Sequence, residues 1–112
     1  MSSPADRSRL ERIESLLAED PQDTFLRYGR ALELEKHAEH SASLAAFHEL
    51  MSDAPPYVPA YFMAAQQLVR LGRSSEAASI LREGIEQARL QGNTHAAGEM
   101  SEFLASLPHD PD

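Results

Sequence analysis

The sequence predicts an all-α fold, and three observations support that prediction. Ala, Leu and Glu, which favour helix, are common, whereas β-branched residues are few and aromatic residues make up 6% of the chain. Apolar residues recur every three to four positions in six segments, each bounded by a turn signal. The 112 residues are 42% hydrophobic and include no cysteine, so the packing of helices in one compact domain has to hold the fold together.

The first three helices are predicted, in chain order, over residues 4–20, 22–38 and 41–54. Pro4 suits the first helical position, and Pro21 follows the end of the first helix. Asp23 lies near the positive end of the second helix. Ser41 is the predicted N-cap of the third helix.

The last three helices are predicted over residues 57–71, 74–91 and 94–107. Pro59 costs little in the first turn of the fourth helix, and Ser74 is the predicted N-cap of the fifth. Gly72 is expected to adopt a left-handed turn, and Gly92 is expected to end the fifth helix. Residues 108–112 are expected to form a flexible tail.

An internal repeat relates three parts of the chain. A shift of 34 residues aligns Ile13 with Phe47 and Leu81, and Pro21 with Pro55. In such a repeat each helix pair buries its apolar face by stacking on its neighbours. Further aligned sets are Leu16, Leu50 and Gly84; Leu17, Met51 and Ile85; Tyr28 and Phe62; Ala31 and Ala65; and Leu34 and Leu68.

The most specific pattern lies in residues 57–85, where small and apolar residues recur at helical spacing on both sides of Gly72. It resembles the tetratricopeptide repeat, whose period is 34 residues. The resemblance covers roughly residues 9–91 and implies antiparallel helix pairs stacked in a right-handed superhelix. The residues that fit the pattern are Tyr61, Ala64, Ala65, Leu68, Ala77, Leu81 and Gly84.

The resemblance implies a single domain over residues 1–107. Its parts are a leading half-repeat helix at 4–20, repeat 1 at 22–54, repeat 2 at 57–91 and a capping helix at 94–107. Arg27 and Arg30 stand where the family pattern is usually apolar, and Ala38 where the turn is usually glycine. Gly84, inside a helix, indicates close packing of another helix, whereas Gly29 is compatible with either packing or the approach of a ligand.

Charge and hydropathy exclude two classes of partner. The formal net charge of -8, with no run of Lys or Arg, disfavours binding to nucleic acid. No segment approaches the roughly 20 consecutive apolar residues that a membrane span needs, and the first residues lack the apolar core of a signal peptide. We therefore expect a cytoplasmic protein that binds neither nucleic acid nor membrane.

Residues that could carry catalysis or bind a metal do not form a recognisable pattern. His37 and His40, with Glu33 nearby, are the densest cluster, but they straddle a predicted turn and so do not share one helix face. No Ser-His-Asp order or phosphate-binding Gly-rich loop is present. We expect no enzyme activity, no metal and no other cofactor.

In the tetratricopeptide-repeat family the first helix of each repeat lines a concave groove that binds peptides or partner helices. The resemblance implies such a groove in this chain, although its carboxylate-binding set of Lys, Asn and Arg is not found. A terminal helix could instead cover the aromatic residues. The residues expected to bind a partner are Phe25, Tyr28, Leu32 and Lys36 from the second helix and Phe62, Gln66, Val69 and Arg70 from the fourth.

Two hypotheses for function follow. The first is a non-catalytic adaptor or scaffold that binds a peptide or helix of a partner protein in this aromatic groove. The second is a structural subunit that associates with itself, for example as a homodimer, through the groove or a terminal helix.

Overall fold

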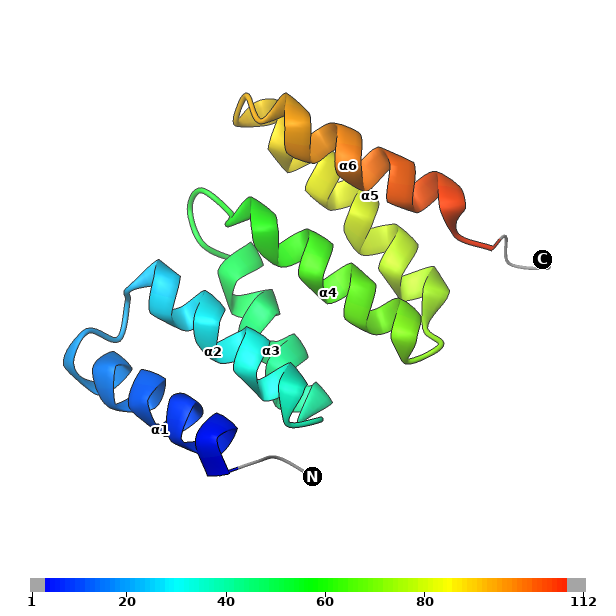
Figure 1. Ribbon diagram of the computed structural model, residues 1–112. Coiled ribbons are helices and arrows are strands. Elements are labelled where there is room, and N and C mark those ends of the chain that lie inside the picture. The colour runs from blue at the N-terminus through cyan, green and yellow to red at the C-terminus, as the bar shows by residue number, and fades with distance from the viewer. Residues whose placement is uncertain (1–3, 109–112) are drawn as a thin grey trace. The chain divides into compact units, whose positions relative to one another are not determined.

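The structure is a computed structural model that describes residues 4–108, with side chains from Ser8 onward. Its regular secondary structure over residues 4–108 consists of six α-helices with no strand, which confirms the predicted all-α class (Figure 1). Residues 109–112 of the predicted tail lie outside this range. The helices are α1 (Pro4–Glu19), α2 (Thr24–Lys36), α3 (His40–Met51), α4 (Val58–Arg70), α5 (Ser74–Leu90) and α6 (Thr94–Ser106).

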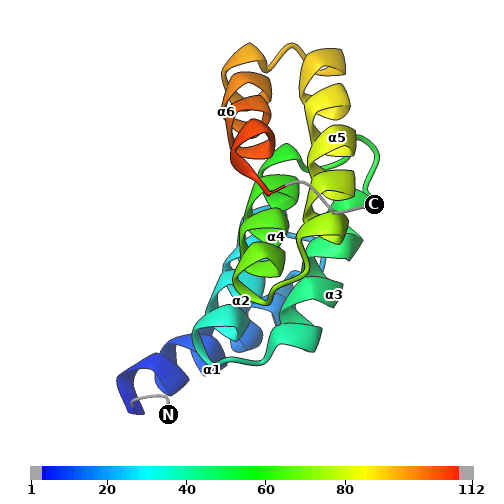
Figure 2. The same cartoon turned by 90° about the vertical axis from the view of Figure 1, so that its right-hand side faces the viewer.

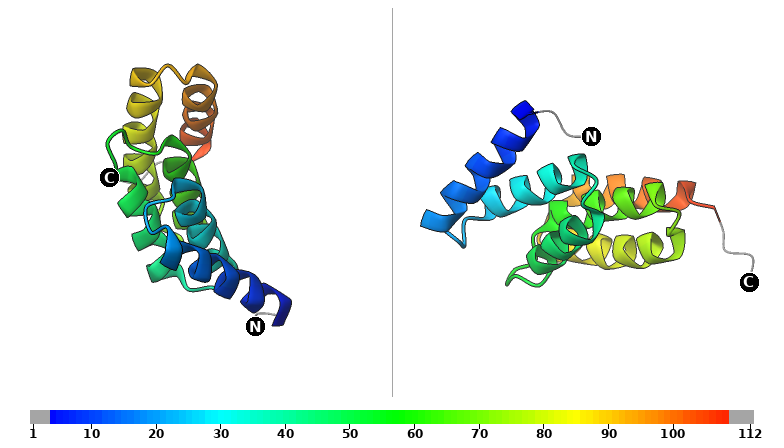
Figure 3. Two further views of the ribbon diagram at one scale, coloured as in Figure 1. Left: turned by 90° about the vertical axis from the view of Figure 1, so that its left-hand side faces the viewer. Right: turned by 90° about the horizontal axis from the view of Figure 1, so that it is seen from below.

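The chain divides into two compact units, Met1–Asp53 and Ala54–Asp112. The predicted single domain over residues 1–107 stays a prediction. In the first unit, α2 and α3 form an antiparallel pair and α1 packs along α2 (Figures 1 and 3). In the second unit, α4 and α5 form an antiparallel pair, and α6 packs beside α5 and also touches α4 (Figure 2).

The 34-residue register places equivalent residues in equivalent surroundings. Phe47 of α3 and Leu81 of α5 are both fully buried, as the alignment predicts. Ala64 and Ala65 of α4, which fit the tetratricopeptide-repeat pattern, are also fully buried. Each unit therefore has its own apolar core between its paired helices, with α1 packed on α2 in the first unit and α6 packed on α5 and α4 in the second.

The two glycines inside helices have different surroundings. A Cβ atom added at Gly84 would lie 2.6 Å from Tyr61 Cβ and 2.8 Å from Met100 Sδ. These distances confirm close helix packing, because α4 and α6 both approach α5 at this point. A Cβ atom at Gly29 would lie 3.8 Å from Ile13 Cδ1, an ordinary van der Waals distance, so packing against α1 leaves room for a methyl group there.

Three connections between helices share one turn. Ala38, Gly72 and Gly92 each have a positive φ, of 60°, 77° and 77°. The predicted left-handed turn at Gly72 and stop at Gly92 are therefore confirmed, and Ala38 adopts the same backbone without the freedom of glycine. In each turn, the residue that follows the one with positive φ donates a hydrogen bond from its N–H to the carbonyl oxygen five residues earlier, as in a Schellman motif. These bonds join Glu39 to Leu34 at 3.0 Å, Arg73 to Leu68 at 2.8 Å and Asn93 to Ala88 at 2.7 Å.

The same turn decides where the next helix begins. Glu39 is both the last residue of its turn and the N-cap of α3, and Arg73 has the same two roles before α5. Neither residue forms a side-chain capping hydrogen bond. The predicted caps Ser41 and Ser74 are therefore wrong. Ser41 lies within α3 and Ser74 is the first residue of α5, because the turn leaves no residue between its last member and the helix.

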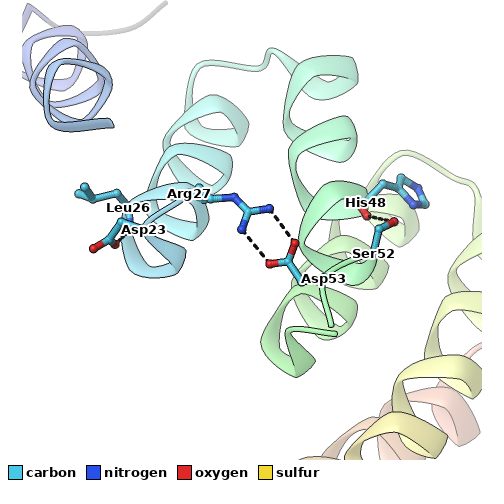
Figure 4. Close-up of polar contacts among 6 residues, drawn as sticks. All are labelled: Asp23, Leu26, Arg27, His48, Ser52 and Asp53. Atoms are coloured by element: carbon cyan, nitrogen blue, oxygen red, sulfur yellow. Dashed lines mark hydrogen bonds and ion pairs between the residues drawn. The ribbon is translucent and has the colours of Figure 1, made fainter. Parts of the chain in front are cut away.

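Side-chain caps are present at two other helix starts. Asp23 Oδ1 accepts a hydrogen bond of 2.8 Å from the N–H of Leu26 at the start of α2 (Figure 4). Asn93 Oδ1 accepts one of 3.1 Å from the N–H of Ala96 at the start of α6. Each bond satisfies an N–H group that has no partner within the helix. The helix α3 ends at Met51, three residues before its predicted end at residue 54.

Arg27 and Arg30, which depart from the family's apolar pattern, both form ion pairs. Arg27 of α2 donates two hydrogen bonds to Asp53, just after α3, with Nη1–Oδ2 at 2.7 Å and Nη2–Oδ1 at 3.1 Å (Figure 4). Arg30 Nε lies 3.1 Å from Glu14 Oε2 of α1. The Arg27 hydrogen bond lowers the pKa of Asp53 and raises that of Arg27. These pairs join α2 to both of its neighbours.

Candidate protein-binding surfaces

The four α2 residues predicted to bind a partner lie along one side of the helix, at spacings of three or four residues. We call Phe25, Tyr28, Leu32 and Lys36 the α2 stripe. Phe25 is 80% exposed in the first turn, and Tyr28 and Leu32 are half-buried. Lys36 is exposed at the other end, where its Nζ lies 3.3 Å from Glu33 Oε1. The stripe thus runs from an exposed aromatic ring to a cation.

Three of the four α4 residues, Phe62, Gln66 and Val69, recur at spacings of four and three residues, and Arg70 comes four residues after Gln66. We call Phe62, Gln66, Val69 and Arg70 the α4 stripe. Phe62, Gln66 and Val69 are half-buried, and Arg70 is exposed near the C-terminal end. Gln66 Nε2 lies 3.8 Å from Met63 Sδ. That the two stripes line one groove stays a prediction.

The sequence leaves open whether these aromatic rings are exposed or covered, and each ring has a contact within its own unit. The Tyr28 ring packs edge-to-face on buried Phe47 of α3, with centroids 6.1 Å apart. The Phe62 ring packs in the same manner on Phe103 of α6, at 5.6 Å. The terminal helix α6 therefore covers part of Phe62, and Tyr28 rests on the core. Phe25 is the aromatic residue of the two stripes that stands most fully in solvent.

Glu33 of α2 is a buried acidic residue that contacts basic residues of two helices. Its Oε1 lies 3.4 Å from Arg9 Nη1 of α1 and 3.3 Å from Lys36 Nζ. Its Oε2 is buried and accepts no hydrogen bond from residues 8–108. Glu33 thus ties Lys36 of the α2 stripe to Arg9 of α1. The sequence offers one signal for this role, since Glu33 and Lys36 are three residues apart in a helix.

Two clefts lie away from the predicted binding residues. A cleft of about 360 Å³ in the first unit has walls from α1, α2 and α3, and both of its arginines, Arg27 and Arg30, are already ion-paired. A cleft of about 360 Å³ in the second unit lies between the start of α5 and the end of α6. Its lining is Ser74, Ser75, Ala78, Arg82, Leu104, Ala105, Leu107 and Pro108. Neither cleft contains a residue of the α2 or α4 stripe.

The histidines next to the α2–α3 turn form no metal site with other residues that the structure describes. His37 follows α2 and His40 begins α3, and residues 8–108 contain no group of three or more His, Cys, Asp or Glu placed to hold a metal ion. Burial raises the pKa of Tyr61, with a smaller effect from the negative charge of Glu83.

None of the helices between residues 4 and 108 is long and apolar enough to span a membrane.

Helix pairs that repeat with a fixed register, and that carry partly exposed stripes on the first helix of each pair, define a helical-repeat protein of the kind that presents surfaces to other proteins. No family model and no curated protein matches the chain. Among solved structures it is similar to the solution NMR structure of a tetratricopeptide repeat domain protein from Salinibacter ruber, with a TM-score of 0.74.

The two sequences are 34% identical, and the match covers 82% of this chain and 96% of that chain. At this identity and coverage the likeness extends beyond the fold. The chain belongs to the tetratricopeptide-repeat family. Its fold is that of a protein-interaction module.

Proposed function

We propose that this chain is a non-catalytic adaptor that binds a peptide or helix of a partner protein through the α2 stripe and the α4 stripe. The observation that carries the proposal is Phe25, an aromatic side chain 80% exposed at the head of the α2 stripe. Aromatic rings supply a large contact area at low cost in conformational entropy, and they dominate protein interfaces. The cytoplasmic location expected from the sequence is part of this proposal.

The remaining stripe residues support the proposal by their chemistry. Half-buried Leu32 and Val69 offer apolar surface on a rigid helix, and the partly exposed Tyr28 and Phe62 rings are held in place by Phe47 and Phe103. Lys36 and Arg70 are exposed cations in the last turns of their helices, and Lys36 also lies 3.3 Å from Glu33 Oε1. Their positive charge is complementary to an acidic group of the partner. The proposed partner segment is therefore an apolar or aromatic peptide that carries a negative charge.

The test uses Phe25 rather than Tyr28 or Phe62, because the latter two rings also pack on other aromatic residues. Peptides are selected on the wild-type protein from a displayed random library, and the best one is titrated by fluorescence anisotropy. Phe25→Ser should weaken binding about tenfold or more. It should change the free energy of unfolding by no more than about 0.5 kcal/mol, since the side chain is exposed.

The matched control is Leu90→Ser, which removes an apolar side chain that is 69% exposed on α5. We expect this variant to bind the selected peptide as the wild type does. Equal peptide affinity in the wild type and Phe25→Ser would exclude the α2 stripe as the binding surface. A selection that enriches no peptide would count against the adaptor itself.

A further inference from the structure

The 34-residue register identifies one face of α1 that differs from the same face of α3 and α5. Its residues are Arg9, Ile13, Leu16 and Asp20, which we call the α1 face. In α5 the aligned residues are Ala77, Leu81, Gly84 and Ala88, all buried. In α3 the first three aligned residues are Ser43, Phe47 and Leu50, all fully buried. In both helices this face contacts the helix before it, as Ser43 Oγ donates to Ala31 O of α2 and Gly84 lies against Tyr61 of α4.

On α1 the same face is partly open, because Arg9 and Ile13 also contact α2 while Leu16 and Asp20 are exposed. Leu16 is 45% exposed, the Arg9 side chain is 48% exposed and Asp20 is exposed, while Ile13 is half-buried against α2. Within residues 4–108, no helix precedes α1 in the chain in the way that α2 precedes α3. An apolar centre flanked by charges is thus partly open to solvent. The positions of Arg9, Ile13 and Leu16 are buried in both other repeats, whereas that of Asp20 is buried in α5, as Ala88, and exposed after α3, as Ala54.

The α1 face is complementary to itself. Arg9 is a cation at one end, Asp20 is an anion at the other, and Ile13 and Leu16 lie between them. When two copies of the helix run antiparallel, residues whose numbers have the same sum lie opposite one another. The sums of 9 and 20 and of 13 and 16 are both 29, so one two-fold axis pairs Arg9 with Asp20 and Ile13 with Leu16.

The backbone supports this register up to its last residue. Asp20 follows the end of α1, but its N–H still donates to Leu16 O at 3.1 Å, which continues the helical pattern. We propose that two copies of this chain associate through the α1 face in an antiparallel, two-fold arrangement. The second copy then covers the face that the preceding helix covers in α3 and α5.

A second copy fits this face better than an unrelated helix, because each of its two charges finds its complement in the same sequence. One helix pair buries less than the roughly 1,600 Å² of a standard interface, so the dimer belongs to the weak class. We expect a dissociation constant in the range of roughly 1 μM to 1 mM.

The first experiment is sedimentation equilibrium over a range of protein concentrations. The weight-average mass of the wild type should rise from 12.4 kDa towards twice that value. Leu16→Ser should weaken dimerisation about tenfold or more, because it removes two apolar contacts per dimer. Leu90→Ser, which removes the exposed leucine of α5, should leave the dissociation constant unchanged.

The second experiment exchanges charges between two copies. Arg9→Glu places two acids opposite one another in its own dimer, and Asp20→Arg places two cations there, so each variant alone should be monomeric. An equimolar mixture restores an opposite-charge pair at both ends of the heterodimer, so its weight-average mass should exceed that of either variant. A change that only disturbs the fold would not produce recovery on mixing.

Two results would overturn the proposal. One is a wild type that stays monomeric up to about 1 mM, the upper end of the expected range. The other is a dimer whose dissociation constant is the same in Leu16→Ser and Asp20→Arg as in the wild type. Arg9 also contacts Glu33 at 3.4 Å, so thermal unfolding checks that Arg9→Glu is folded. If that variant does not fold, Leu16→Ser and Asp20→Arg decide the question. Peptide binding at Phe25 does not involve the α1 face, so each proposal can fail alone.

Discussion

At the residue scale, Gly84 is the point where the lack of a side chain sets the distance between helices. An added methyl group would lie 2.6 Å from Tyr61 Cβ, so Gly84→Ala has to push α4 away from α5. We expect a loss of about 1–3 kcal/mol in the free energy of unfolding from overpacking. Gly98, inside α6, has no atom within 4 Å of an added Cβ. Gly98→Ala should therefore raise stability, by roughly 0.5–1 kcal/mol, through helix propensity alone.

Urea titration of both variants measures these changes. If Gly84→Ala were as stable as Gly98→Ala, the close approach of Tyr61 to α5 would be disproved.

Ala38 is a second residue whose backbone decides the outcome of a substitution. It has φ of 60° where the equivalent turns have glycine, and an L side chain is strained in that conformation. Ala38→Gly should raise the free energy of unfolding by roughly 0.5 kcal/mol, after the added freedom of the unfolded chain is subtracted.

The reverse change at the aligned position, Gly72→Ala, should lower the free energy of unfolding by about 1 kcal/mol. No atom lies within 4 Å of an added Cβ at Gly72, so the effect would come from the backbone. Melting temperatures by circular dichroism report both changes. Two shifts of the same sign would contradict the left-handed turn at one of the two positions.

At the scale of elements, α2 is held to α3 by a bidentate ion pair that depends on pH. The hydrogen bond from Arg27 keeps the pKa of Asp53 below its ordinary value of 3.8. A carboxylate with a depressed pKa in the folded state stabilises the fold above pH 3.8 and loses that effect as the pH falls through the lowered value. Asp53→Asn should therefore cost roughly 0.5–1 kcal/mol at pH 7, and the difference from the wild type should disappear below that lowered pKa.

The comparison of the two proteins at each pH cancels the titration of all other groups. The matched control is Glu14→Gln, which breaks the more exposed pair with Arg30 and should cost at most about 0.5 kcal/mol at pH 7. Urea titrations at several pH values provide the measurement. A stability difference between the wild type and Asp53→Asn that persisted at pH 2 would show that the charge of Asp53 is not its cause.

At the scale of the whole molecule, the helices could be predicted because the same apolar pattern recurs after 34 residues. Phe47 and Leu81 are buried alike because both sit on the face that meets the preceding helix, and a 34-residue shift superimposes them. The burial of Ala64 and Ala65 was predictable from the tetratricopeptide-repeat pattern of residues 57–85 rather than from the shift, which aligns Ala65 with Ala31 but Ala64 with Arg30. Periodicity fixes which side of a helix is buried, and that suffices to define the pairs.

Features that depend on individual side-chain partners could not be predicted in this way. The partner of Arg27 is Asp53, and no local spacing indicates a contact across that separation. The caps at Ser41 and Ser74 were mispredicted, since residue preference alone does not show that the preceding turn already supplies the N-cap residue. At the candidate site, the sequence predicted the residues of the α2 stripe. Only the structure shows that the Phe25 side chain is exposed to solvent while the Tyr28 ring packs on Phe47.

The shared turn has a consequence for how the length of this chain can change. In His37–Glu39, Leu71–Arg73 and Gln91–Asn93 every residue either closes one helix or opens the next. One added residue would therefore have to enter a helix, where it turns all later side chains by about 100° and carries apolar residues into water. Insertions and deletions should be tolerated only in the connections Asp20–Asp23 and Ser52–Tyr57, which carry no such motif. In the other connections we expect the chain to lengthen or shorten by a whole helix pair.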